Sequence, residues 1–518
     1  MPDDVLNTAL SPVVEISSGK IRGAVAGGIH AFKGIPYGAP TNGANRFRQP
    51  QPVTAWTGVK DALAYHGKAP QSPAQVKRRG EMDGILGPLD TTAETEDCLT
   101  LNVWTPGMSG KRPVMVWLHG GAFAYGSGNR AVTDGANLAR RGDVVVVSVN
   151  HRLNICGYLH LDDIGGERFA GSGNAGSLDM VRALEWVRDN IAAFGGDPGC
   201  VTIFGESGGG GKVSALLVMP GAKGLFHRAV IQSGAAVRFT TRERANALAD
   251  AVVKQLGGID KLQDAPLSAL LGAIIPASKA AGPRTFPLLD RYDFGPVVDG
   301  KMVSQHPAEP TTSPLGDDIP LMIGGTAREA SLFLDDDAVW HRTLTEDQLR
   351  ERLAAIAGTD TGAALAIYKA RMPGANPGDR LIDALTGSNF SVRTWLYAER
   401  RAAKGGAPVY HYSLDWASPF AGGRMGAHHA MDLPFVFDTT DVPLTTKGAD
   451  GAPELAAAMS ATWAAFARNG KPDNPAIPAW PAYTGDTRAT MLFDTRCRVV
   501  NDPLRDAREL WSRVATRA

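Results

Sequence analysis

The sequence predicts an α/β fold, with a large and mostly parallel central sheet flanked by helices. Residues 114–118 and 144–149 are unbroken apolar runs, which are typical of strands that helices cover on both faces. Residues 179–194 carry apolar side chains at helical spacing, and a β-rich run follows at 201–204. Strands that alternate with helices in this way predict a parallel sheet with right-handed crossovers.

The remaining elements follow along the chain. Residues 12–60 predict a short strand meander, and 67–95, rich in Gly, Pro, Ala and charge, predicts a long surface loop. Further strands are expected at 101–104, 229–234, 321–325 and 409–412, and helices at 345–357, 363–371, 383–403, 459–468 and 504–517. We expect a single domain over 1–518, with 67–95 and roughly 238–318 as lid or cap insertions over a site.

Composition excludes several classes of partner. The chain has 518 residues, 44% of them hydrophobic, and its 53 basic residues balance its 53 acidic residues, so neither nucleic acid nor an anionic membrane is expected to bind it.

Two acids stand among the first four residues, and no apolar run is long enough to cross a bilayer, so we expect a cytoplasmic protein. Metal ligation is not expected, because no His cluster is near the cysteines and they lie far apart: Cys98, Cys156, Cys200 and Cys497.

One motif carries the chemistry. Gly205-Glu206-Ser207-Gly208-Gly209 follows the β-rich run 201–204 and precedes a helix-compatible run at 212–219. A serine at such a corner lies on a strained turn that exposes its hydroxyl, as in the nucleophile elbow of an α/β-hydrolase fold. The glycines do not fit a phosphate loop or a dinucleotide-binding loop, because Val213 stands where those motifs need Ser, Thr or Gly.

Such a serine needs an oxyanion hole, a base and an acid. The strand 114–118 runs into His119-Gly120-Gly121-Ala122-Phe123, whose backbone N–H groups could bind an oxyanion together with that of Gly208. The base should be a histidine that follows the acid in the sequence, and the pair His428-His429 lies in a loop of small residues. The acid should follow a strand; Glu329 fits, and so do Asp335, Asp336 and Asp337.

Several motifs resemble those of the type-B carboxylesterases, a family that includes bacterial para-nitrobenzyl esterases, animal carboxylesterases and cholinesterases. The likeness runs nearly end to end. It includes Glu96-Asp97-Cys98-Leu99, His119-Gly120-Gly121-Ala122-Phe123, Asn150-His151-Arg152-Leu153, Gly173-Asn174-Ala175-Gly176, the Ser207 turn and Pro478-Ala479-Trp480-Pro481.

The resemblance implies a role for particular residues. It places the acid of a catalytic triad on Glu329 and the histidine on His429, with Ser207 as nucleophile. It also implies oxyanion donors at Gly121, Ala122 and Gly208, supporting groups under the nucleophile at Glu206 and Ser233, and a structural ion pair between Glu96 and Arg152.

The chain also departs from the family pattern. The family's usual alanine after the nucleophile is Gly208 here, so we expect a freer turn with less preorganisation. Secreted members pair the cysteine at Cys98 with another whose position is Ala69 here, so Cys98 should be a free thiol. Residues 69–98 contain no aromatic residue, so recognition of quaternary ammonium groups is not expected.

The function expected from these residues is hydrolysis of small-molecule carboxylic esters, bulky or xenobiotic ones included, through an acyl-enzyme intermediate and without a metal or organic cofactor. Two alternatives remain open. The same residues could hydrolyse amides or carbamates, and the family has catalytically silent binding members. A monomer or a weak homodimer is expected.

Overall fold

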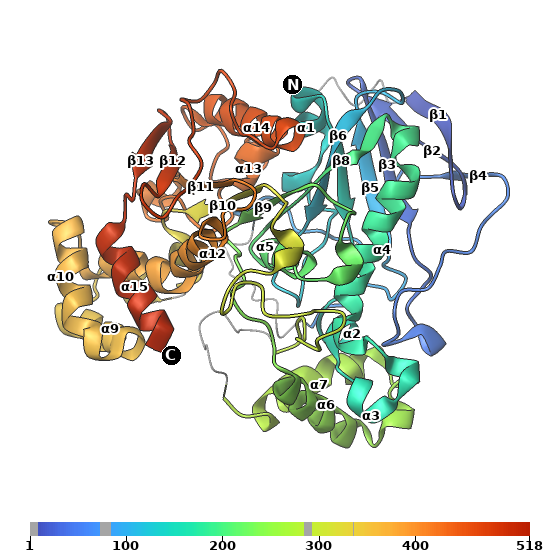
Figure 1. Ribbon diagram of the computed structural model, residues 1–518, viewed down its shortest axis with the longest axis horizontal. Helices are drawn as coiled ribbons and strands as arrows, with labels where there is room; N and C mark the ends of the chain where they lie inside the picture. Colours follow the sequence, from blue (N-terminus) through green and yellow to red (C-terminus); the bar gives the residue numbers. More distant parts are fainter. Residues whose placement is uncertain (1–8, 73–83, 284–292, 335, 518) are drawn as a thin grey trace.

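A computed structural model describes residues 9–72, 84–283, 293–334 and 336–517. Its centre is one 13-stranded mixed sheet (Figure 1). From one edge to the other the strands are β1 (Ala9–Ile16), β2 (Gly19–Ala26), β3 (Ile29–Pro36), β5 (Thr100–Thr105), β7 (Val145–Val149), β6 (Arg112–Leu118), β8 (Gly196–Glu206), β9 (Arg228–Gln232), β10 (Leu321–Thr326), β11 (Val409–Leu414), β12 (Ala489–Phe493) and β13 (Arg498–Asn501), and β4 (Val59–Asp61) pairs with β2.

In this order the strands from β7 to β12 are parallel to one another, whereas the pairs outside them are antiparallel except for β2 with β4, which is parallel. The predicted α/β-hydrolase fold is therefore confirmed. Because all the parallel strands end at the same edge, the loops after β6, β8 and β10 meet there. The predicted oxyanion, nucleophile and acid segments are those three loops.

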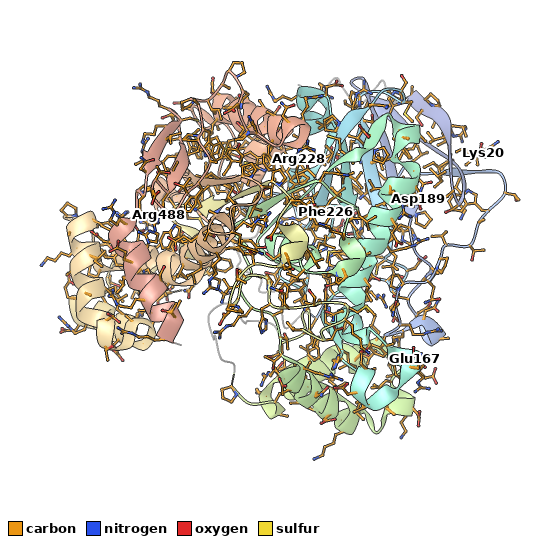
Figure 2. All side chains as sticks on the ribbon, in the orientation of Figure 1. Lys20, Glu167, Asp189, Phe226, Arg228 and Arg488 are labelled. Atoms are coloured by element: carbon orange, nitrogen blue, oxygen red, sulfur yellow. The ribbon has the colours of Figure 1, made fainter. Side chains whose placement is uncertain are left out.

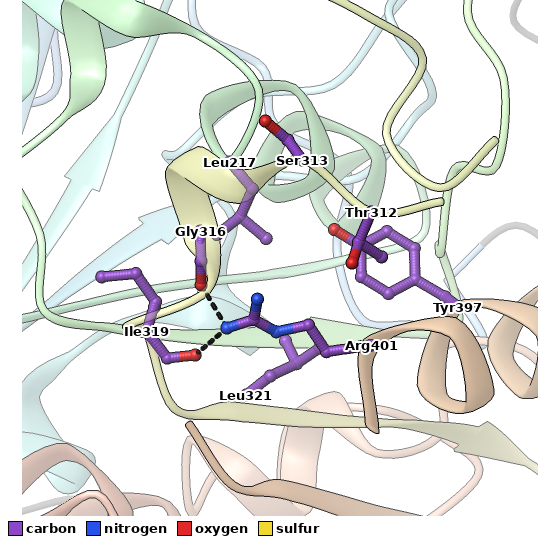
Figure 3. A pocket seen from close by; sticks show the side chains of 8 residues that line it. All are labelled: Leu217, Thr312, Ser313, Gly316, Ile319, Leu321, Tyr397 and Arg401. Carbon is purple, nitrogen blue, oxygen red and sulfur yellow. Dashed lines mark hydrogen bonds between the residues drawn. The ribbon is translucent and has the colours of Figure 1, made fainter. Parts of the chain in front are cut away.

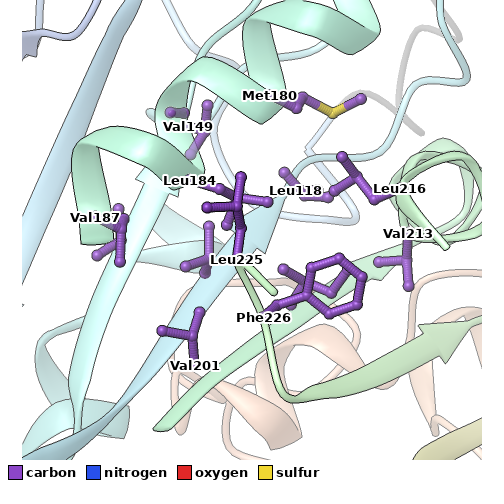
Figure 4. Close-up of a cluster of buried hydrophobic side chains, with 14 of the residues drawn as sticks. Leu118, Val149, Met180, Leu184, Val187, Val201, Val213, Leu216, Leu225 and Phe226 are labelled. Atoms are coloured by element: carbon purple, nitrogen blue, oxygen red, sulfur yellow. The ribbon is translucent and has the colours of Figure 1, made fainter. Parts of the chain in front are cut away.

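Each face of the sheet has its own hydrophobic core, as the period of two along a strand requires. Val114 and Val116 of β6 pack in the core beneath α4 (Ala175–Asn190), while Met115 and Trp117 pack in the core beneath α14 (Ala452–Asn469). Figure 4 shows the first of these cores, where Met180, Leu184 and Val187 of α4 pack with apolar side chains of the sheet and of α5 (Gly208–Leu216). Charged side chains such as Lys20, Glu167 and Asp189 lie on the outside (Figure 2).

Two groups of helices form hydrophobic cores of their own beside the sheet (Figure 1). The helices α6 (Arg242–Leu256) and α7 (Leu267–Ala280) share a core with α2 (Asn154–Tyr158). The second group has its own core and consists of α9 (Glu346–Ala357), α10 (Thr361–Arg371), α11 (Pro377–Thr386), α12 (Val392–Ala402) and α15 (Arg505–Arg517). The shorter helices are α1 (Ala136–Gly142), α3 (Asp162–Gly165), α8 (Asp337–Trp340) and α13 (Leu433–Val436).

Two expectations about the elements need correction. The helix expected over 383–403 is interrupted by a π-helical turn at Gly387–Ser391, where a side chain on residue 387 would collide with Trp511. The strands β12 and β13 were not expected. Each is too short to show a clear periodic pattern, so only its pairing with a neighbouring strand identifies it as a strand. Parts of the expected lid and cap, 73–83 and 284–292, lie outside the described residues.

The ion pair expected between Glu96 and Arg152 is wrong. Arg152 is buried and pairs with Asp179 at 2.5 Å, while Glu96 pairs with Arg46 at 2.6 Å. Each guanidinium donates two hydrogen bonds to its own carboxylate, a geometry that fixes partners more strictly than charge alone does. Cys98 is a free, buried thiol, as predicted. Over the described ranges, no helix combines the length and apolar character needed to cross a membrane.

Candidate active site

Ser207 lies at the turn between β8 and α5. Its φ of 56° falls in a region that residues other than glycine rarely adopt, and it makes no side-chain capping bond to the helix. The turn is held from both sides, because the Ser207 N–H donates to the Gln232 carbonyl at 2.8 Å and the Gly211 N–H donates to the Ser207 carbonyl at 3.1 Å. Strain that is held in this way is characteristic of functional sites.

The predicted oxyanion segment, His119-Gly120-Gly121-Ala122-Phe123, lies directly against this turn. A Cβ on Gly208 would lie 2.2 Å from the backbone N and Cα of Ala122, and one on Gly209 would lie 2.0 Å from the Leu118 carbonyl. Gly121 and Ala122 both have positive φ, 86° and 51°. Gly208 and Gly209 are therefore packed tightly against this segment, so the expectation of a freer turn is wrong. The backbone at Gly208 lies closer to Ala122 than an alanine at position 208 would allow.

This packing distinguishes two glycines of the same helix. A Cβ at Gly211 would meet Phe123 at 3.4 Å, an ordinary contact, so Gly211→Ala should stabilise the protein by about 0.5–1 kcal/mol through helix propensity and preserve activity. Gly208→Ala must displace Ala122, and we expect it to lower kcat by at least about tenfold, since small misplacements are costly in catalysis. Urea unfolding and ester kinetics on both variants check this, and equal activities would contradict it.

His429 and Glu329 are brought together although 100 residues separate them in sequence: His429 Nδ1 donates to Glu329 Oε2 at 2.6 Å. Glu329 follows β10, and its other oxygen accepts from the Thr326 N–H at 2.8 Å. Both side chains are buried, with His429 4% exposed and Glu329 1% exposed. The arrangement fixes the orientation of the imidazole and places its Nε2 beside the side chain of Glu206, the residue before Ser207.

The alternative acids have other surroundings. Asp336 caps α8 by accepting from the Val339 N–H at 3.1 Å and pairs with Arg352 at 2.6 Å; although partial burial opposes the effect, these contacts lower its pKa. Asp337 is exposed in the first turn of α8, and Asp335 lies outside the described residues. The neighbouring His428 donates from Nδ1 to the His429 carbonyl at 2.7 Å, and burial lowers its pKa to about 4. His428 is therefore neutral.

His429 Nε2 lies 3.1 Å from Glu206 Oε1. Among the described residues, no hydrogen bond joins the Ser207 hydroxyl to His429. Burial raises the pKa of Glu206. Burial lowers the pKa of His429, but the nearby carboxylates of Glu206 and Glu329 outweigh that effect and raise it.

Beneath these groups lies a polar network that the sequence analysis missed. Asp432 Oδ2 accepts from Gln232 Nε2 and from the Tyr412 hydroxyl, both at 2.9 Å, and Gln232 Oε1 accepts from Trp463 Nε1 at 3.1 Å. Ser233, expected under the nucleophile, is buried with a φ of 53°. The sequence contains one indication of this network, which is that its residues stand close to predicted site residues. Asp432 follows His429 by three positions, and Gln232 directly precedes Ser233.

Aromatic rings surround the site and were also missed. Phe333 and Phe390 stack at 5.6 Å between ring centroids, and their rings lie 4.8 and 5.2 Å from that of His429. Phe123, next to the oxyanion segment, meets the edges of Tyr158 and Phe239. The four phenylalanines named here are only partly buried. They come from segments far apart in the chain, so no local pattern could have grouped them.

A pocket elsewhere in the molecule is structural. It is lined by Leu217, Thr312, Ser313, Tyr397 and others, and the Arg401 guanidinium enters it and donates to the carbonyls of Gly316 and Ile319 (Figure 3). These bonds join α12 to the segment before β10. In the part of the chain that the structure describes, no group of three or more His, Cys, Asp or Glu residues is arranged to hold a metal ion.

Comparison with known proteins gives a consistent result. The model of the carboxylesterase family matches residues 10–511. The para-nitrobenzyl esterase of Bacillus subtilis is 37% identical over 96% of this chain and 98% of its own, and the phenmedipham hydrolase of Pseudarthrobacter oxydans is 34% identical over 95% and 97%. A solved esterase of Clostridium hathewayi, described as hydrolysing aliphatic aromatic polyesters, superposes with a TM-score of 0.82 at 36% identity, covering 98% of this chain and 100% of its own.

Proposed function

Because the chain belongs to the carboxylesterase family and is a carboxylesterase, we propose that Ser207, His429 and Glu329 hydrolyse its ester substrates through an acyl-enzyme. The observation that carries this proposal is the 2.6 Å bond between His429 Nδ1 and Glu329 Oε2, beside a strained serine at the strand-to-helix turn. All three groups lie at the edge where the parallel strands end, which is where sites of this fold class are built.

In the proposed reaction the Ser207 hydroxyl attacks the acyl carbon while His429 Nε2 accepts its proton. Glu329 keeps the other proton of the imidazole on Nδ1 and stabilises the imidazolium. The imidazolium then protonates the departing alcohol, and a water molecule repeats the sequence on the acyl-enzyme to release the acid and regenerate Ser207. His429 must be neutral to act as the base, so the raised pKa predicts activity that increases as the pH rises through it.

The tetrahedral oxyanion is assigned to the backbone N–H groups of Gly121, Ala122 and Gly208. The positive φ of Gly121 and Ala122, together with the close packing of Gly208 on Ala122, supports this assignment. Donors fixed before the reaction stabilise the developing charge without reorganisation, and loss of one such donor typically costs about 10²–10³ in kcat.

For the substrate, the partly exposed rings of Phe123, Phe239, Phe333 and Phe390 favour esters with a bulky or aromatic group, which could lie against them. The names of two similar proteins also point to substrates with an aromatic group: one is a para-nitrobenzyl esterase, and the other is an esterase described as hydrolysing aliphatic aromatic polyesters. We further propose that the segment 238–318, with its helices α6 and α7, caps the site of a single 1–518 domain.

Labelling by a fluorophosphonate probe tests the nucleophile. The reagent forms a covalent bond only with an activated serine, so we expect one adduct per chain, located by mass spectrometry on the peptide containing Ser207. Matched p-nitrophenyl butyrate and p-nitrobutyranilide separate ester from amide hydrolysis, with turnover of the ester expected to be faster. Absence of labelling would indicate a catalytically silent protein, and an adduct on another serine would move the site.

A further inference from the structure

A lysine is buried completely behind the oxyanion segment. Lys212 lies on α5, five residues after Ser207, and is 0% exposed. Its Nζ donates to the His119 carbonyl at 2.7 Å. Lysine is almost never fully buried unless it is paired or has a particular task, because removing its amino group from water is costly. The catalytic sequence proposed above does not use it.

The bond acts on the backbone that leads into the oxyanion segment. Each peptide unit is planar and trans, so its carbonyl and its N–H point in opposite directions, and holding the one fixes the other. Lys212 holds the His119 carbonyl, and His119 Nδ1 donates to the next carbonyl, that of Gly120, at 2.8 Å. The carbonyl of Gly121 accepts from the N–H groups of Ala124 and Tyr125, at 3.2 and 3.1 Å.

Three consecutive carbonyls, 119 to 121, are therefore each held by a hydrogen bond. The N–H groups that these bonds fix belong to Gly120, Gly121 and Ala122, and the last two are the donors assigned to the oxyanion. We propose that Lys212 is a positioning residue for ester hydrolysis, whose amino group orients the oxyanion segment through the His119 carbonyl. The inference deepens the proposed function and rests on it.

The surroundings of the amino group support a fixed rather than a mobile contact. The rings of His119 and His151 stack at 5.0 Å, and His151 Nδ1 donates to the Arg152 carbonyl at 2.8 Å. Burial, and then the charge of Lys212, lower the pKa of both histidines, so both are neutral donors. Burial also lowers the pKa of Lys212, against the attraction of Glu206, but an amine donates to a carbonyl in either protonation state.

Lys212→Met tests this role, because it preserves the unbranched apolar stem and removes the donor. We expect kcat for p-nitrophenyl butyrate to fall by about 10- to 100-fold, since the donors are displaced rather than lost, with KM nearly unchanged. A trifluoromethyl ketone, which forms a tetrahedral adduct with the nucleophile, should lose affinity by the same factor. The melting temperature should fall only slightly, because the cost of leaving the His119 carbonyl without its donor is set against the gain from removing a buried amino group.

The matched control is Ser214→Ala, two residues further along the same helix. Ser214 is also buried and hydrogen bonded, to the carbonyl of Gly210 and the N–H of Ala236, and neither of these bonds involves the oxyanion segment. It should keep the kcat of the wild type. A kcat for Lys212→Met equal to that of the wild type, or a loss matched by Ser214→Ala, would overturn the proposal.

Lys212→Leu provides a second apolar variant if Lys212→Met does not fold. Loss of the fold in both would also overturn the proposal, since the amino group would then support stability rather than position the segment. Ser207→Ala distinguishes failure of the proposed function from failure of the role proposed for Lys212. If that variant keeps its activity, the proposed function fails; if it is inactive while Lys212→Met is normal, only the role of Lys212 fails.

Discussion

Ser207→Ala is expected to abolish ester turnover, lowering kcat for p-nitrophenyl butyrate by about 10⁶-fold, because no other group can form the acyl-enzyme. The fold should survive. The serine side chain makes no capping bond to α5, and alanine meets the same backbone strain at a φ of 56°, so we expect the free energy of unfolding to change by less than about 0.5 kcal/mol. Initial rates and urea unfolding measure the two quantities separately.

The comparison that interprets this result is again Ser214→Ala, which also removes a hydroxyl from α5. That variant should remain active and should still react with a fluorophosphonate, whereas Ser207→Ala should do neither. Turnover by Ser207→Ala near that of the wild type would show that the nucleophile is another residue.

Glu329→Gln should have the second-largest effect, a loss of about 10⁴-fold in kcat. The amide keeps the shape and can still accept from the Thr326 N–H, but it would donate to His429 Nδ1 instead of accepting from it. The imidazole proton would then lie on Nε2, the atom that must accept the proton of Ser207. The loss should therefore appear in kcat, with little change in KM.

The same variant has a defined pH signature. The Glu329 carboxylate is among the groups that raise the pKa of His429, so a neutral glutamine lowers it. His429 then reaches its basic form at lower pH, and the acid limb of the pH profile of kcat/KM should move to lower pH while the maximum falls. A shift to higher pH would contradict the electrostatic role of Glu329.

Asp336→Asn is the matched control for the acid. It should weaken the cap of α8 and the pair with Arg352, at a cost of about 1 kcal/mol in stability, and leave kcat unchanged. A larger loss of activity from Asp336→Asn than from Glu329→Gln would overturn the assignment of the acid.

The sequence by itself determined the fold class and the strained turn at Ser207. Both depend on local patterns: unbroken apolar runs such as 114–118 reveal strands buried on two faces, and a glycine-flanked serine between strand and helix reveals a strained corner. Likeness to a family then selected Glu329 and His429, which local pattern alone left open.

Only the tertiary structure decided what depends on contacts between distant segments. It paired Arg152 with Asp179 rather than with Glu96, because the geometry of a guanidinium selects a partner that charge alone does not. It gathered Phe333 and Phe390 around His429, and it placed the Lys212 amino group on the His119 carbonyl. In the sequence, Lys212 is only a lysine that follows four glycines. Folding buries its side chain and points its amino group at the His119 carbonyl, and this makes it part of the proposed site.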